Sequence, residues 1–174
     1  TSSGTSVSQA TAAASSSQNQ SKYEANVASV AGKMDNRVIA AYQQLGFKLV
    51  VDPSVNYSGY FDARSRSITM KQIDDSVYHE LGHFLAFIAG NADKTASFQS
   101  IFAAEKANVT AFNKAYVTQN ASEYFAESVK DYILNNASLK SSRPQTYAAV
   151  QNALNQITDA QIAKIQKIYG AFWN

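Results

Sequence analysis

Hydrophobic and polar residues follow different periods in different parts of the chain. In two runs, at residues 27–34 and 38–45, hydrophobic side chains recur every three or four positions, which predicts helical structure that ends at Gly46. Short hydrophobic runs bounded by turn residues follow at residues 47–51, 57–62 and 67–71, and these runs predict β-strands. A small sheet is therefore expected before the middle of the chain.

Helical periodicity returns after the predicted sheet and continues to the end of the chain. A helix is predicted from an N-cap at Asp74 or Asp75 to about Gly90. Further helices are predicted at residues 94–106, 121–135, 144–157 and 160–172. We expect an α+β fold, with a small twisted sheet and one long helix at residues 22–90 and a helical half at residues 91–174.

The composition indicates one folded domain that follows a flexible arm. Residues 1–21 are dominated by Ser, Thr, Ala and Gln and contain no charged or aromatic residue. Such a segment buries too little apolar surface to offset the entropy lost on ordering. We expect a flexible arm at residues 1–21, as the remnant of a linker, and a single domain at residues 22–174.

Charge and cysteine usage limit the partners and the environment of the protein. The formal net charge of +2 and the absence of a Lys/Arg cluster do not favour nucleic acid or an anionic membrane as a partner. No apolar run approaches the roughly 18–20 residues of a membrane span, and no signal peptide opens the sequence. We expect a monomer that is secreted or exported to the cell surface, with its signal peptide already removed. Because cysteine is absent, nitrogen and oxygen must hold any metal ion.

The strongest chemical signal is a His-Glu-x-x-His motif on the predicted long helix. His79 and His83 lie one turn apart on the same side of a helix, so both imidazoles can bind one metal ion. Glu80 is placed to act as a general base on a water molecule without becoming a ligand. Alternatively, the segment is an amphipathic core helix with two hydrogen-bonded histidines. Gly82 favours the metal site, because a glycine inside a helix costs about 0.8–1 kcal/mol relative to Ala and suggests a close approach by another element.

A catalytic zinc ion has three protein ligands and one water, so the motif leaves one ligand to find. With only two histidines and no cysteine, this ligand must be a carboxylate, and Glu105, Glu123 and Glu127 are the glutamates that follow the motif. Glu123 and Glu127 lie one turn apart on a predicted helix, so one can bind zinc while the other orients a ligating imidazole. The alternative is that Glu123 belongs to a helix cap and Glu127 pairs with Lys130.

The sequence resembles the catalytic domain of anthrax lethal factor and, more closely, the clostridial Pro-Pro endopeptidases of the same metalloprotease family. The resemblance covers about residues 73–150. Four segments carry it: Ser97–Glu105, Tyr116, Ser122–Ser128 and Pro144–Tyr147. It implies a zincin-like fold of the gluzincin type, in which Glu123 binds zinc, Glu127 supports a ligating histidine and Tyr116 assists catalysis. A phenol at Tyr116 can donate a hydrogen bond to the developing oxyanion.

These observations predict a zinc-dependent endopeptidase that binds one Zn²⁺ per chain and acts on an extended protein or peptide substrate. Zinc lowers the pKa of its bound water towards about 7, and Glu80 removes the proton. The alternatives are a zinc amidase with a non-protein substrate and a catalytically dead surface-binding module. The related enzymes carry a substrate-contacting Trp in a loop before the motif, whereas the only Trp of this chain is Trp173, so cleavage between prolines is not predicted.

An exposed strand edge can hold an extended substrate by main-chain hydrogen bonds. The candidate edge is the short segment Tyr57, Ser58, Gly59, Tyr60 and Phe61, immediately upstream of the motif helix. Within it, Gly59 allows a close approach of another backbone. The alternative is an ordinary hairpin strand with a purely structural role.

Overall fold

The computed structural model describes residues 21–173, so the arm predicted at residues 1–21 lies outside the described residues, apart from Ser21. Four strands form one sheet in the order β1-β2-β4-β3. They are β1 (Tyr23–Ala25), β2 (Lys48–Val51), β3 (Gly59–Asp62) and β4 (Ser67–Met70). β2 runs parallel to β4, whereas β1 is antiparallel to β2 and β3 is antiparallel to β4. β3 is consequently an edge strand.

The structure confirms the three predicted strands as β2, β3 and β4, although β3 begins two residues later than expected. The two helical runs predicted before the sheet correspond to α2 (Val27–Val30) and α3 (Asn36–Gln44), whereas the strand β1 that precedes them was not predicted. Three residues carry too little periodicity to predict a strand. β1 forms because it pairs with β2, a contact between distant segments that a local pattern does not contain.

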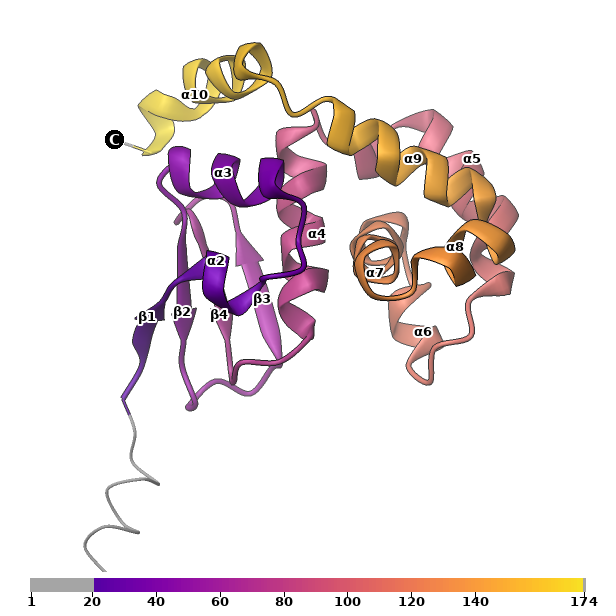
Figure 1. The fold of residues 1–174 in the computed structure, drawn as a ribbon, viewed down its shortest axis with the longest axis horizontal. Coiled ribbons are helices and arrows are strands. Elements are labelled where there is room, and N and C mark those ends of the chain that lie inside the picture. Colours follow the sequence, from indigo (N-terminus) through magenta and orange to yellow (C-terminus); the bar gives the residue numbers. More distant parts are fainter. Residues whose placement is uncertain (1–20, 174) are drawn as a thin grey trace, which may run out of the picture.

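The motif helix α4 (Ser76–Ile88) packs with α3 against the sheet (Figure 1). Leu49, Ile68 and Met70 from the strands are buried in the same core as the apolar side chains of both helices. Tyr42 of α3 ties the layers together, because its hydroxyl donates to the Lys48 carbonyl at 2.5 Å and accepts from the Ile68 amide at 3.1 Å. The sheet is thus a rigid platform beside the motif helix.

The second half is helical, as expected. It consists of η1 (Ala92–Lys94), α5 (Ala96–Glu105), η2 (Lys106–Asn108), α6 (Lys114–Val117), α7 (Ala121–Leu134), α8 (Asn136–Ser142), α9 (Pro144–Asn155) and α10 (Asp159–Trp173). The four predicted helices correspond to α5, α7, α9 and α10, while the short helices α6 and α8 were not predicted. α7 lies among α4, α5, α6, α8 and α9, and α10 returns to one end of the sheet, beside α3 (Figure 1). Within residues 21–173, no helix has the length and apolar character needed to cross a membrane.

The two halves meet where α4 packs on α7, and Gly82 makes this contact possible. A Cβ atom at Gly82 would lie 2.7 Å from both the Cα and the carbonyl oxygen of Ala126. The close approach that the sequence suggested at Gly82 is therefore an approach of the α7 backbone. It brings side chains of α7 next to the histidines of α4.

Gly82→Ala is expected to destabilise the protein. The added methyl group would push α7 away from α4, and overpacking of this kind typically costs about 1–3 kcal/mol, more than the gain of up to about 1 kcal/mol in helix propensity. Urea unfolding would show the lower midpoint. Gly32→Ala is the matched control, because a Cβ atom there would meet its nearest neighbour, the Ala28 carbonyl oxygen, at 3.9 Å. Equal midpoints for Gly82→Ala and the wild-type protein would contradict the close α4–α7 packing.

Candidate active site

The two histidines of the motif lie side by side on α4, with ring centroids 5.0 Å apart. Donor atoms of His79, Glu80 and His83 all lie within 4.8 Å of one another. His79 and Glu80 are buried, and His83 is partly buried. One turn of helix therefore places both imidazoles and one carboxylate around a single point.

Glu123 approaches both histidines from the first turn of α7. Its Oε2 atom lies 2.9 Å from His79 Nε2, and its Oε1 atom lies 3.3 Å from His83 Nε2. Asn120 caps the helix by accepting a hydrogen bond from the Glu123 amide at 2.8 Å. The cap thus uses the Glu123 main chain, while the carboxylate of Glu123 faces the imidazoles.

Glu127 lies one turn further along α7 and contacts the other nitrogen of the same ring. His79 Nδ1 donates to Glu127 Oε2 at 2.9 Å. Glu127 Oε1 lies 3.6 Å from Lys130 Nζ. The His79 ring is therefore held between two carboxylates, and this pair of contacts fixes its orientation.

The electrostatics of this group favour a cation between the side chains. Burial lowers the pKa of His79, but the hydrogen bonds with Glu123 and Glu127 outweigh it and raise the pKa to about 9. Burial raises the pKa of Glu123, but the hydrogen bonds with His79 and His83 outweigh it and hold the pKa well below its usual range. The pKa of Glu127 is lowered against burial in the same way by its hydrogen bond to His79. Both carboxylates are thus held in their charged form.

The donor set fits zinc. In a tetrahedral site with bonds of about 2.0–2.1 Å, neighbouring ligand atoms are about 3.3 Å apart. The separations of 2.9 Å and 3.3 Å between the Glu123 oxygens and the two Nε2 atoms are close to that value. The Glu80 carboxylate is also near both rings. Glu123 contacts both Nε2 atoms directly, whereas Glu80 packs against Gly59 of β3.

Glu80 points from α4 towards the edge strand β3. A Cβ atom at Gly59 would lie 2.8 Å from Glu80 Cγ, so only glycine leaves room for this side chain. Burial raises the pKa of Glu80, while the nearby His79 and His83 and a hydrogen bond from the Phe61 main chain oppose the increase. A carboxylate with a raised pKa is suited to accept and return a proton.

Tyr116 lies on α6, and its ring is near the ring of His79. Its ring centroid is 6.4 Å from that of His79, and the residue is 55% exposed. Burial of the hydroxyl end, the negative charge of Glu123 and a hydrogen bond with that carboxylate raise the pKa of Tyr116 to about 12. The phenol therefore keeps its proton at neutral pH and can act as a hydrogen-bond donor.

A hollow of about 280 Å³ lies next to this group, between β3, α4, α6 and α7. Its lining includes Ser58 and Gly59 from the predicted substrate edge, together with His79, Glu80, Tyr116 and Glu127. Ser76, Asn113 and Lys130 also line it, and sequence reasoning did not place any of them in the site. The proximity of Lys130 to Glu127 could have indicated Lys130, whereas Ser76 and Asn113 carry no comparable signal.

The predicted substrate edge is only partly in the cleft. Tyr57 and Ser58 precede β3, so they are not part of the strand. The Phe61 ring belongs to the core, where it stacks on Phe47 at 6.0 Å. Tyr60 is exposed and lies 6.0 Å from the Tyr57 ring. Any role of this segment therefore depends on its main chain rather than on a row of side chains in the cleft.

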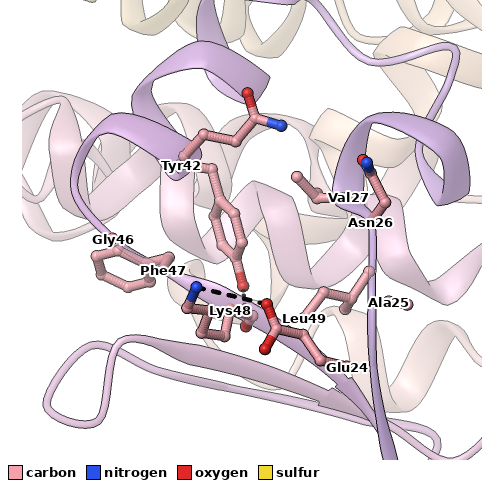
Figure 2. A pocket seen from close by; sticks show the side chains of 10 residues that line it. Glu24, Ala25, Asn26, Val27, Tyr42, Gly46, Phe47, Lys48 and Leu49 are labelled. Carbon is pink, nitrogen blue, oxygen red and sulfur yellow. Dashed lines mark hydrogen bonds and ion pairs between the residues drawn. The ribbon is translucent and has the colours of Figure 1, made fainter.

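Another hollow, of about 400 Å³, lies between β1, α2, α3 and β2 (Figure 2). Its charged groups are Glu24 and Lys48, which form an exposed ion pair at 3.4 Å. Tyr42 lies in its wall, and that hydroxyl is engaged by the main chain. Its lining contains no histidine, so this hollow does not resemble the His79 site in its chemistry.

Comparison with known proteins places this chain in a family. The model of the family described as Anthrax toxin lethal factor, N- and C-terminal domain, matches residues 62–153, more than half of the chain, so the chain belongs to this family. The chain is also similar to the Pro-Pro endopeptidase of Clostridioides difficile (strain 630), with 41% identity over 78 residues. That match covers 42% of this chain and 34% of the relative, about a third of its length. The resemblance inferred from the sequence is confirmed.

Proposed function

We propose that this chain is a zinc-dependent endopeptidase with a zincin-like fold, in which His79, His83 and Glu123 bind one Zn²⁺. The observation that carries the proposal is the convergence of three nitrogen and oxygen donors from α4 and α7 at distances suited to zinc. Family membership and the name of the relative, an endopeptidase, support a protein or peptide as substrate. The expected secretion of the chain stays a prediction.

Each residue has a distinct role in the proposed reaction. Bound zinc would supply a Lewis acid and lower the pKa of a water molecule. Glu80 accepts the proton as the water attacks the peptide carbonyl, and later passes it to the leaving amine. Tyr116 donates a hydrogen bond to the oxyanion. Glu127 holds the His79 ring in place through Nδ1.

The edge of β3 is the proposed place for the substrate backbone. The Lys71 amide donates to the Ser58 carbonyl at 3.1 Å, and Tyr60 pairs with Thr69 two residues further on. Because hydrogen-bonded and non-hydrogen-bonded pairs alternate in an antiparallel ladder, the main-chain groups of Gly59 and Phe61 point away from β4. Glu80 lies against Gly59, where a Cβ atom would meet Glu80 Cγ at 2.8 Å, so an extended peptide paired along Gly59 would pass beside the general base.

The metal ligands can be tested by their effect on zinc content. Glu123→Ala should remove a ligand and lower zinc occupancy from one per chain to well below it. Glu127→Ala should remove only the support of His79, an effect typically worth about 10–100-fold in affinity, so zinc should remain bound at micromolar concentrations. Elemental analysis of protein purified without chelator provides the measurement. Equal retention of zinc in the two variants would remove Glu123 from the ligand set and leave it with its capping role.

A further inference from the structure

The side chain of Lys130 lies where two hollows meet. The hollow beside the histidines shares Asn113, Glu127 and Lys130 with a second hollow of about 360 Å³. The second hollow lies between the segment before α6 (residues 108–113), α7 and α8. Its lining is mainly polar and includes Thr110, Asn135 and Ser138. A peptide that leaves the cleft on this side would pass over the Lys130 ammonium group.

The Lys130 ammonium group has hydrogen-bonding capacity left for another partner. Its Nζ atom lies 3.6 Å from Glu127 Oε1, beyond the 2.7–2.9 Å that is typical of strong charge-assisted hydrogen bonds. Glu127 makes its shorter contact with His79, at 2.9 Å. The Lys130 side chain is 29% exposed. It is therefore accessible from the cleft but held in place by α7.

The other charged groups near Lys130 already have closer partners. Asp131 is paired with Arg143, whose guanidinium also donates to Ser128 at 3.1 Å and is buried. Asp74 accepts from the Ser76 amide at 3.0 Å and from Gln72 at 3.1 Å. Among the described residues that line the two hollows, Lys130 is thus the cation most available to a ligand.

We propose that Lys130 binds a carboxylate of the substrate, so that the enzyme prefers peptides with an acidic residue close to the cleaved bond. This inference rests on the proposed endopeptidase function. An ammonium group binds as a point charge, so Asp and Glu side chains satisfy it equally, and so does a free C terminus. The neighbouring amide of Asn113 adds a donor of the kind that a carboxylate accepts.

Positional peptide libraries test this preference. N-acetylated, C-amidated decapeptides carry Glu, Gln or Arg at one fixed position and mixed residues elsewhere, and mass spectrometry gives the rate and position of cleavage by the zinc-loaded protein. We expect Glu to be cleaved about tenfold faster than Gln at one position relative to the cut, because Gln keeps an acceptor oxygen but loses the negative charge that strengthens the hydrogen bond. A matched set with free C termini shows whether a chain end can serve as the carboxylate.

Three variants separate recognition from a structural role. Lys130→Gln should bring the Glu-to-Gln ratio close to one, and Lys130→Arg should restore part of the preference. Lys164→Gln on α10, an exposed lysine outside the cleft lining, should leave the ratio at its wild-type value. A wild-type ratio near one, a preference for Arg, or an equal loss for the Glu and Gln peptides in Lys130→Gln would overturn the proposal.

A binding assay distinguishes failure of this inference from failure of the proposed function. The same Glu and Gln libraries are passed over immobilised Glu80→Gln protein, and their retention is compared. Stronger retention of Glu peptides without any cleavage by the wild-type protein would support the Lys130 site and contradict the endopeptidase. Cleavage by the wild-type protein with equal retention would support the endopeptidase and contradict the Lys130 site.

Discussion

Replacing Glu80 with glutamine is expected to lower kcat by about 10²–10⁴-fold, the usual contribution of a general base. Glutamine has nearly the same shape as glutamate, so the packing of this side chain against Gly59 should persist. The amide cannot accept the proton of the attacking water. Steady-state cleavage of a peptide that the wild-type protein hydrolyses gives kcat, while elemental analysis and circular dichroism should show unchanged zinc content and fold.

The control for this change is a glutamate outside the cleft. Glu24 on β1 forms an exposed ion pair with Lys48, and Glu24→Gln should leave kcat unchanged. If Glu80→Gln retained zinc and wild-type activity, another group would have to accept the proton. If Glu80→Gln lost zinc together with activity, Glu80 would be a ligand rather than the base.

Tyr116→Phe is expected to lower kcat by about 10²–10³-fold with little change in KM, the usual loss for one oxyanion donor. The substitution removes only the hydroxyl group, and the residue is 55% exposed, so stability should not change much. Peptide hydrolysis under saturating substrate provides kcat.

Tyr147→Phe is the matched control for the loss of a hydroxyl. The Tyr147 hydroxyl donates to Asn136 at 3.2 Å and is not part of the cleft lining. This variant should hydrolyse peptides at the wild-type rate. A Tyr116→Phe enzyme as active as the wild type would mean that Tyr116 does not act on the oxyanion, despite its place beside His79.

The sequence predicted those helices and strands whose hydrophobic and polar residues alternate with a regular period. The motif helix has a continuous apolar stripe, and β2, β3 and β4 are bounded by turn residues, so these elements were found. β1 depends on pairing with a distant segment, and α6 and α8 are too short to show a helical period, so these elements were missed. The arrangement of α4 on α7 could be suspected from Gly82, but the sequence alone did not identify the partner helix.

The candidate site was predictable to different degrees. The spacing of His79 and His83 implied that both imidazoles can reach one metal ion, because residues four apart lie on the same side of a helix. Glu123 and Glu127 were equivalent by spacing, and only the resemblance to a family gave them different roles. The packing of α7 on α4 separates them physically, since one carboxylate contacts both Nε2 atoms and the other contacts Nδ1. Lys130 entered the site because α7 turns it towards the cleft.

The proposed function requires one zinc ion bound by His79, His83 and Glu123. Anomalous diffraction at the zinc absorption edge, from crystals grown without chelator, tests it most directly. A single peak per chain is expected, about 2.0–2.2 Å from His79 Nε2, His83 Nε2 and a carboxylate oxygen of Glu123. A peak bound by Glu80 in place of Glu123, or no peak between the two histidines, would contradict it.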